Sequence, residues 1–500
     1  MERQSLYAAI CAGPRDDLPK LVFADWLDEH GDHVDRAHAE LIRIQCEWDS
    51  DALVNLRLVE PYRLDFNRPH WPDPALIATH DPQAARAIQL LSRSTELEPL
   101  TKTRPVMPLP EVNGAAYRYV GPVKGLRNGL RIKLAPTWYK RLSELRSRLP
   151  IRHVVTDIQE GRPDPARVPS PVEMDVLTHI ESLTSWHPVP DLALEILASP
   201  HSGHLRRVTL PYSNAGDMRL NETLSRAEHL SELDELELGN FCRWHDCIPL
   251  PSDRLRQLRR LSLGGGDPYS FDPVLLQFAE AANNRLEVLS LVNVAQTDAI
   301  ALSLTFSTFP QLVELNLGDS VLTGRGATDL LTGNFPELRQ LNVSNNRLVD
   351  FVGKTLEKTF QYPRLHSLDV SFCQFSPSAI ASLTRWPGFA HLRKLVLNGN
   401  PLNHQALAAL GSADAPNLRT LGLANCHLHG SHVRELVTSR FVRSLWLLDL
   451  RANFYDDAFV RALIETPFLD ALQCLLLDVP EESPDYLRLK ARFCDRFQSA

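Results

Sequence analysis

Apolar and polar positions in this chain follow a short alternation that returns at a nearly constant interval. From residue 205 to residue 482, segments of the form Leu-x-x-Leu-x-Leu recur, and 338–343 (LRQLNV) is the clearest copy. Successive side chains of a strand point to opposite faces, so the alternation predicts short strands with one buried face. The second apolar position of the eleven copies holds Val208, Leu236, Leu261, Leu289, Leu315, Leu341, Leu368, Leu395, Leu421, Leu448 and Leu475, at intervals of 25 to 28 residues.

The segments between these strands carry apolar residues at helical spacing. Helices are predicted over 326–331, 378–383, 405–410, 433–437 and 457–464. Prolines stand between helix and next strand at Pro310, Pro336, Pro363, Pro387, Pro416 and Pro467, where a helix breaker is expected. Each unit is therefore predicted to be a strand, a turn, a helix and a return loop, which requires all strands to run in the same direction.

A column of small polar or thiol side chains follows the strands, at the ninth position of each copy. It contains Ser320, Asn346, Cys373, Asn400, Cys426 and Asn453. Such side chains are expected to turn inward and bind backbone groups, because buried polar groups are normally paired. The period and this column resemble leucine-rich repeats of the ribonuclease-inhibitor-like class. That resemblance implies an α/β solenoid, with parallel strands on the concave face, helices on the convex face and one continuous core.

Residues 1–50 predict a small all-α module of three helices. The first is expected to end near Gly13, the second to run from an Asp17 cap to Gly31 with Pro19 in its first turn, and the third to span 35–47. Their apolar sides are predicted to hold Leu6, Ala9 and Ile10, then Leu21, Val22, Ala24, Trp26 and Leu27, then Ala37, Leu41, Ile44 and Trp48.

Within this module, 21–32 (LVFADWLDEHGD) and 40–45 (ELIRIQ) resemble the bacterial repeat-companion domain. The resemblance implies a bacterial protein in which a short module precedes repeats, and it implies no activity. The charged residues Asp25, Asp28, Glu29 and His30 are expected to lie on a helix surface, with Asp25 paired to Arg36 or Arg43. The alternative is an acid/base or ligand role for these four side chains.

The remaining segments are predicted from their proline content and weaker alternation. Residues 51–124 are expected to be an irregular, Pro-rich connection with a short helix at 82–94. Residues 125–204 are expected to be degenerate cap repeats, with strands 126–134 and 151–158, a helix 138–149, a loop 159–171 and a further copy at 177–180. The full repeats occupy 205–482, and 483–500 should cap them with a helix over 484–497 that buries Tyr486, Leu487, Leu489 and Phe493.

Composition narrows the class of protein. The 53 basic and 61 acidic residues leave a net charge of −8 with a pI near 6.1, which argues against a nucleic-acid partner. No apolar run approaches the ~18 residues that cross a bilayer, and the N-terminus lacks the apolar core of a signal peptide. The eight cysteines are scattered rather than arranged as a disulfide framework. We expect a cytoplasmic, monomeric protein without membrane or nucleic-acid partners.

Three clusters suggest chemistry but lack the residues that would complete a site. Cys242, His245 and Cys247 have no fourth zinc ligand nearby in the sequence. The glycines at 264–266 lack the lysine and hydroxyl of a phosphate-binding loop. The imidazoles at 427, 429 and 432 are expected to be a solvated surface cluster. Since no enzyme motif occurs, we expect no catalytic activity, no cofactor and no metal.

The predicted concave face remains as the candidate site. Solenoids commonly use such a row of outward side chains as an extended binding surface. We expect a protein partner to contact Glu235, Glu237, Arg260, Glu314, Asn316, Asp319, Gln340, Asn342, Asp369, Phe372, Lys394, Asn398 and Asp449. The expected function is a non-catalytic protein-interaction scaffold. The alternative, from fold analogy, is a regulatory effector such as a GTPase activator or a ubiquitin-ligase-type adaptor, with Arg451 or Asn345 as the contributing side chain.

Overall fold

The computed structural model describes two compact units of the chain. One comprises Met1–Leu210 with Arg226–Glu232, and the other comprises Pro211–Ser225 with Leu233–Ala500. The described residues are 2–12, 17–32, parts of 35–46, 117–119, 129–133, 153–157, 175–185, 191–210, 218–239, 256–264, 285–292, 297–306, 309–331, 335–348, 362–480, 482–494 and 497–499.

The N-terminal helices enclose a small core of their own. Helix α1 spans Glu2–Ala12, α2 spans Leu18–His30, and the described residues of 35–46 are helical. The buried side chains are Tyr7, Ile10, Phe23, Ala24, Leu27, Ala39 and Ile42, with Leu6, Trp26 and Cys46 packed against them. The predicted apolar side of α1 is wrong at Ala9, which is exposed while Tyr7 is buried. The predicted positions 37, 41, 44 and 48 lie outside the described residues.

Two aspartates of this module have different partners. Asp17 occupies the N-cap position of α2, but its backbone is helical and its side chain makes no capping hydrogen bond. Its carboxylate instead accepts a hydrogen bond from Nζ of Lys20 at 2.7 Å, and that lysine is only 1% exposed. A buried ammonium requires a counter-charge, and the Asp17 carboxylate supplies it. Because this carboxylate pairs with Lys20 and does not bind a helix N–H, the predicted cap is wrong. Asp25 pairs with Arg43 at 2.8 Å, one of the two predicted partners.

Five strands belong to the first unit. They are β1 (Tyr117–Tyr119), β2 (Gly129–Lys133), β3 (His153–Asp157), β4 (Ser182–Ser185) and β5 (Arg207–Leu210). Strands β2 to β5 are parallel, and their register aligns Leu130, Val154, Leu183 and Val208. The cap residues therefore continue the repeat register, with helix α10 at Asp191–Ala198 and short 3-10 turns η1 (Asp175–His179) and η2 (Pro200–Ser202).

One prediction for this region is wrong: strand β1 lies within 51–124, the segment expected to be an irregular connection, and it pairs antiparallel with β2. The further copy expected at 177–180 is shifted by a few residues: Asp175–His179 form the 3-10 turn η1, and the strand follows at β4, where Leu183 aligns with Val208. The predicted helices at 82–94 and 138–149 and the loop at 159–171 lie outside the described residues.

The second unit is an uninterrupted series of parallel strands. They are β6 (Glu235–Leu238), β7 (Arg260–Gly264), β8 (Val288–Val292), β9 (Glu314–Asn316), β10 (Gln340–Asn342), β11 (Ser367–Asp369), β12 (Lys394–Val396), β13 (Thr420–Gly422), β14 (Leu447–Asp449), β15 (Cys474–Leu477) and β16 (Phe497–Ser499). From β6 to β15 the register places the predicted leucines, from Leu236 to Leu475, in one row. The predicted repeat period and strand direction are confirmed.

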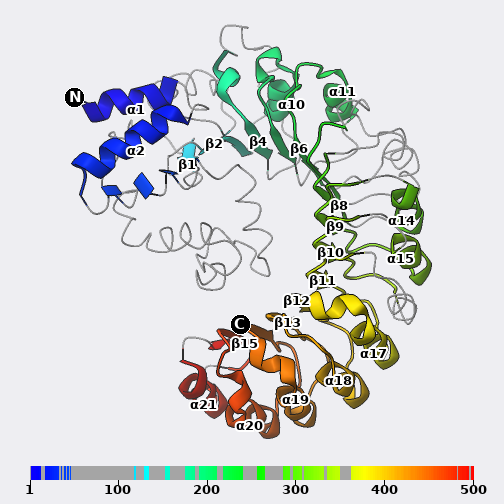
Figure 1. Ribbon diagram of the computed structural model, residues 1–500. Coiled ribbons are helices and arrows are strands. Elements are labelled where there is room, and N and C mark those ends of the chain that lie inside the picture. The colour runs from blue at the N-terminus through cyan, green and yellow to red at the C-terminus, as the bar shows by residue number, and fades with distance from the viewer. Residues whose placement is uncertain are drawn as a thin grey trace. The chain divides into compact units, whose positions relative to one another are not determined.

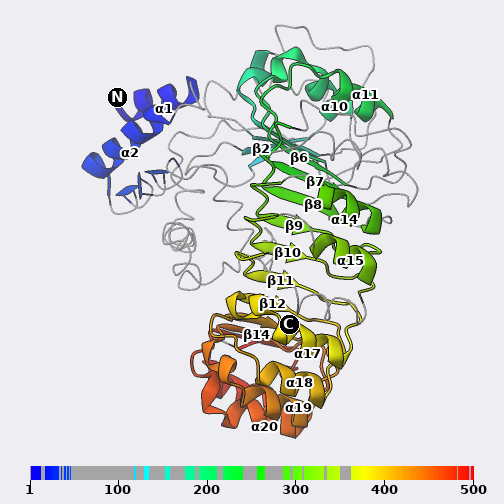
Figure 2. The same cartoon turned by 45° about the vertical axis from the view of Figure 1, so that its right-hand side comes forward.

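The described helices that connect these strands lie on one side of the sheet (Figures 1 and 2). They are α11 (Met218–Arg226), α14 (Thr297–Phe306), α15 (Gly324–Leu331), α17 (Pro377–Arg385), α18 (His404–Gly411), α19 (Gly430–Val437), α20 (Asp457–Glu465) and α21 (Pro484–Phe493), with 3-10 turns η3 (Pro387–His391), η4 (Arg440–Ser444) and η5 (Pro467–Leu469). Side-chain oxygens of Ser376, Asn403, Asp456 and Ser483 accept the N3 amide at four helix starts. None of the helices in the described part of the chain has the length and apolarity needed to cross a membrane.

The C-terminal cap differs from its prediction. Helix α21 ends at Phe493 rather than near residue 497, and Phe497–Ser499 forms β16, which pairs parallel with β15. Leu489 and Phe493 are fully buried, whereas Leu487 is 65% exposed. Residues four apart share one face of a helix, so 489 and 493 face the last repeat and 487 lies on the outer side.

Candidate functional site

Two columns of side chains project from the sheet on the side away from the helices. The register aligns Glu235 with Arg260 and Glu314 with Gln340 in the first column. These side chains are half-buried, and Nε of Arg260 lies 3.9 Å from Oε1 of Glu235. Lys394 continues this column, and Glu237, Asn316, Asn342, Asp369 and Asp449 lie in the second column. The structure thus brings these ten predicted residues into two neighbouring columns.

Four members of the second column have a structural task that the sequence analysis missed. Oδ1 of Asn316, Asn342, Asp369 and Asp449 accepts the backbone N–H two residues later, at 3.0, 2.9, 2.9 and 3.1 Å. These Asx turns satisfy donors at the carboxyl end of each strand. Asn or Asp at the middle position of Leu-x-Leu, between the two apolar residues, would have been the signal for them. A partner would therefore meet the remaining polar atoms of these side chains.

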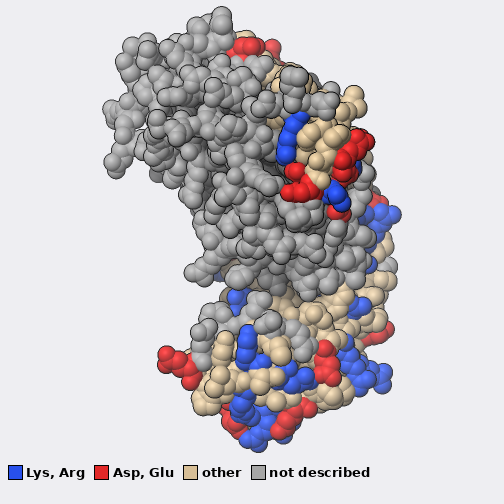
Figure 3. Space-filling view, turned by 90° about the vertical axis from the view of Figure 1, so that its left-hand side faces the viewer, with Lys and Arg blue, Asp and Glu red and all other residues tan. Residues whose placement is uncertain are grey.

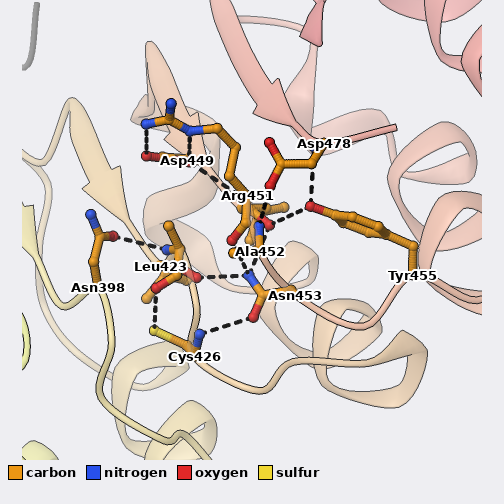
Figure 4. Close-up of polar contacts among 11 residues, drawn as sticks. Asn398, Leu423, Cys426, Asp449, Arg451, Ala452, Asn453, Tyr455 and Asp478 are labelled. Atoms are coloured by element: carbon orange, nitrogen blue, oxygen red, sulfur yellow. Dashed lines mark hydrogen bonds and ion pairs between the residues drawn. The ribbon is translucent and has the colours of Figure 1, made fainter. Parts of the chain in front are cut away.

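Asp449 is also bound by an arginine of its own repeat (Figure 4). Nε and Nη2 of Arg451 donate to the two carboxylate oxygens of Asp449 at 2.9 and 2.8 Å. The hydrogen bond to Asp449 is the main cause that raises the pKa of the Arg451 guanidinium. Asp449 is 6% exposed, whereas the Arg451 side chain is 42% exposed, so the guanidinium lies at the surface and covers the carboxylate.

Three further predicted residues lie on the turns that follow the strands. Asp319, Asn345 and Phe372 occupy equivalent positions and have left-handed backbone angles, with φ of 53°, 52° and 54°. Nδ2 of Asn345 donates to Oδ1 of Asp319 at 2.8 Å. Phe372 adopts this left-handed conformation although bulky residues rarely do. Its side chain is 48% exposed. Asn398, the last predicted residue, uses Oδ1 to accept the N–H of Ala424 in the next repeat at 2.8 Å.

A ladder of buried Asn and Cys side chains supports these turns, as predicted. Oδ1 of Asn453 accepts the N–H of Cys426 at 3.0 Å (Figure 4). It also accepts the N–H of Leu428 at 2.9 Å. Its amide donates to the carbonyls of Leu423, Leu450 and Arg451. Asn346 and Asn400 form equivalent bonds in their repeats.

The cysteines of the ladder act as weak donors. The thiol of Cys426 contacts the carbonyls of Leu397 and Ala424 at 3.3 and 3.4 Å, and that of Cys373 contacts Val343 and Ser371. Burial raises the pKa of both thiols to about 12. Thiols in this state are poor nucleophiles and metal ligands, so both cysteines are structural.

The other two clusters with candidate chemistry are the Cys/His group at 242–247 and the imidazoles at 427–432. Cys242, His245 and Cys247 lie outside the described residues. The structure adds His404 to the imidazole group, with ring centroids 4.3 Å from His432, while His429 lies 3.8 Å from His432. His427 instead packs on Phe454 at 5.9 Å. Among the described residues, no group of three or more His, Cys, Asp or Glu side chains is arranged to hold a metal ion.

Comparison with known proteins concerns the repeats. No protein-family model matches the chain. A segment of 99 residues is 38% identical to human leucine-rich repeat-containing protein 14, covering 19% of this chain and 20% of that protein. The chain thus spans only about a fifth of the length of this curated relative.

Solved structures are similar at the level of the fold alone. An internalin from Listeria monocytogenes has a TM-score of 0.39 and 14% identity, over 71% of this chain and 87% of that chain. A chain of the mouse RP105/MD-1 complex has a TM-score of 0.35 and 18% identity, over 70% of this chain and 59% of that chain. The in-register parallel strands, their connecting helices and the Asn/Cys ladder make this chain a leucine-rich-repeat solenoid.

Proposed function

We propose that the chain is a non-catalytic scaffold that binds a protein partner through the two columns of polar side chains on the sheet. The observation that carries this proposal is their strict register, which spaces hydrogen-bonding groups by the strand separation of about 4.8 Å. From β6 to β12 the columns offer donors, acceptors and both signs of charge on a rigid support. A rigid, pre-formed surface lowers the entropic cost of binding.

One similar structure supports this direction at the level of the repeat class. One solved structure is a complex between RP105 and MD-1, so that repeat protein associates with another protein. The human relative is named for its leucine-rich repeats. Neither similarity extends to a partner for this chain.

The regulatory alternative receives less support from the site. An arginine that completes the active site of a GTPase must reach outward to the bound nucleotide. The guanidinium of Arg451 is already held by both carboxylate oxygens of Asp449, and Asn345 is bound to Asp319. We therefore prefer the scaffold to an effector with a catalytic side chain.

The setting of the protein is part of the same proposal. The resemblance of residues 1–50 to the bacterial repeat-companion domain supports a bacterial protein with a second contact module. Cys373, Cys426 and Cys494 are free thiols in the described part of the chain, which fits a reducing, cytoplasmic location. We include a monomeric state in this proposal.

A charge-exchange experiment tests the scaffold. Glu314→Lys with Lys394→Glu inverts two charges of the first column without changing the net charge. Glu465→Lys with Arg434→Glu does the same on helices α20 and α19, where both residues are exposed. Partners crosslinked by the native chain in lysate should be lost from the sheet variant and retained by the helix variant. Equal retention by both variants would reject the sheet face as the binding surface.

A truncation lacking residues 1–50 then assigns recognition within the chain. Retention of the same partner by the truncated protein supports binding by the repeats. Loss of the partner on truncation, with retention by the sheet variant, would transfer recognition to the N-terminal module.

A further inference from the structure

Three side chains of helices α18 and α19 form a chain of hydrogen bonds at the protein surface. Nδ1 of His404 lies 3.0 Å from Oε2 of Glu435, and Nε2 of the same ring lies 3.4 Å from Oγ of Ser431. A hydroxyl, an imidazole and a carboxylate thus stand in the order of a Ser-His-acid triad, in which the acid orients the base and the base faces the nucleophile. We call these three residues the α18–α19 triad.

Two neighbouring repeats are needed to assemble this triad. Ser431 and Glu435 are four residues apart in α19 and therefore share one face of that helix. His404 is the first residue of α18, which belongs to the preceding repeat and packs beside α19 (Figures 1 and 2). Because His404 lies 27 residues before Ser431 and no G-x-S-x-G motif surrounds that serine, only the structure brings the three groups together.

The hydrogen bonds set the chemical state that nucleophilic attack requires. A carboxylate only accepts hydrogen bonds, so in the neutral ring of His404 the hydrogen sits on Nδ1, towards Glu435, and Nε2 is unprotonated. The hydroxyl of Ser431 donates to this Nε2, and Nδ1 of His429 lies 3.2 Å from the same hydroxyl oxygen. His404 is therefore placed as the general base for Ser431, and Glu435 is a positioning residue.

The start of α19 adds a donor for negative charge at the same place. Helix α19 spans Gly430–Val437, so Ser431 is its second residue. The backbone N–H groups of His432 and Val433 donate to the carbonyl of His429, whereas that of Ser431 donates to no acceptor in the described part of the chain. An N–H group at a helix N-terminus stabilises negative charge, including that on the oxygen of a tetrahedral intermediate.

The triad is open to solvent, and its surroundings carry both signs of charge. The side chains of His404 and Glu435 are 61% and 32% exposed, and Ser431 is exposed. Arg434 is the neighbour of Glu435 on α19. Figure 3 shows acidic and basic side chains interspersed on the lower part of the view, where the C-terminal repeats lie. This setting favours a small, uncharged substrate that reaches the hydroxyl from outside.

We infer that the α18–α19 triad hydrolyses short-chain carboxylic esters. Oγ of Ser431 bonds to the acyl carbon while its proton passes to Nε2 of His404, and the ester C–O bond then breaks as the alcohol leaves with that proton. Water, giving a proton to the same nitrogen, attacks the acyl group, and the carboxylic acid leaves as the proton returns to Oγ of Ser431. Exposure to water weakens the electrostatic stabilisation, so turnover should be slow. The triad lies on the helices, so this activity and the scaffold function proposed for the sheet columns stand or fall separately.

The test measures the reaction of the full chain with an alkyl fluorophosphonate, in which the serine oxygen displaces fluoride and remains bonded to phosphorus. Peptide mass spectrometry would follow the label at Ser431 and at Ser378, the matched internal control. Ser378 is also exposed and is the second residue of its helix, α17, but its hydroxyl contacts that of Ser376 at 2.8 Å and no imidazole among the described residues. Ser431 should react about tenfold faster than Ser378 or more.

Variants separate the base from its support. His404→Gln should lower the labelling rate of Ser431 by about tenfold or more, whereas His427→Gln, at an exposed imidazole on Phe454, should leave that rate unchanged. Glu435→Gln should lower the limiting rate constant of labelling while the probe concentration at half-maximal rate and the melting temperature stay the same, which a merely structural role would not produce.

Hydrolysis itself is measured with p-nitrophenyl acetate. The native chain should carry an acetyl group on Ser431 during the reaction, and Ser431→Ala should hydrolyse the ester more slowly. The inference fails if Ser431 and Ser378 of the native chain react alike with the fluorophosphonate, if His404→Gln and His427→Gln label at the same rate, or if Ser431→Ala hydrolyses p-nitrophenyl acetate as fast as the native chain.

Discussion

The phenyl ring of Phe372 occupies the space that a side chain at position 399 would need. A Cβ atom at Gly399 would come within 2.2 Å of Cδ1 and 2.3 Å of Cε1 of that ring. The two residues hold equivalent places in consecutive repeats, and both have left-handed backbone angles, with φ of 54° and 67°. The absent side chain in one repeat thus accommodates the exposed aromatic ring of the repeat before it.

We predict that Gly399→Ala destabilises the repeats by roughly 1–3 kcal/mol, because the new methyl group meets the ring and the left-handed conformation disfavours alanine. Urea denaturation followed by circular dichroism would measure the loss. Adding Phe372→Ala should recover part of it, since the clash is then removed and the backbone strain remains. A double variant no more stable than Gly399→Ala would show that the ring contact is unimportant.

The Asn/Cys ladder predicts an order of stabilities at position 453. Asn453→Ala leaves two backbone N–H groups and three carbonyls of a buried turn without their side-chain partner, which should cost about 2 kcal/mol or more. Asn453→Cys should cost less, because Cys426 shows that a thiol fits the same position. Thermal unfolding of the three proteins checks the order native, Cys, Ala. Equal melting temperatures for the Ala and Cys variants would contradict it.

The imidazole group predicts lower stability at acidic pH. Burial, and then the charges of His429 and His404, lower the pKa of His432 from its ordinary 6.5, while Glu435 raises it. Nδ1 of His432 also accepts the N–H of His429 at 3.4 Å, which requires an unprotonated nitrogen. Below pH 6.5 the unfolded chain therefore binds more protons at this residue than the folded chain, and stability falls as pH falls through that range.

The measurement is the melting temperature between pH 7.5 and 5.0. His432→Asn keeps a hydrogen-bond acceptor at the start of α19 but cannot gain a proton there, so its melting temperature should fall less than that of the native protein. His427→Asn is the matched control, because that ring lies apart on Phe454. If the native protein and His432→Asn lost the same stability, the group would not be responsible.

Thiol labelling should separate the cysteines by their place in the fold. Burial raises the pKa of Cys373 and Cys426 to about 12, and Cys494 is exposed. At pH 7.5 iodoacetamide should modify Cys494 readily and leave the two ladder cysteines unmodified until denaturant is added. Peptide mass spectrometry would measure the extent of reaction at each site. Rapid modification of Cys426 in the native protein would contradict the buried ladder.

The spacing of Leu-x-Leu was sufficient to predict the strands, their direction and the row of core leucines. A strand this short cannot bury its leucines alone, so the period requires stacking in register. The Asn/Cys column was equally predictable, since buried turns need a side chain that binds their backbone groups. The end of α21 and the strand β16 were not predictable in this way. Residues 497–499 do not carry the repeat pattern, and their strand is defined by its pairing with β15.

The sequence by itself therefore determined which residues form the core and which face outward in each repeat. Only the tertiary structure decided what those outward residues contact, because their partners lie about one repeat away or across a turn. It assigned Asn316 and Asp369 to turns, bound Arg451 to Asp449 and placed His404 beside His432. Periodicity is a local property that each repeat expresses separately, whereas these pairings depend on how side chains of neighbouring turns and repeats meet in space.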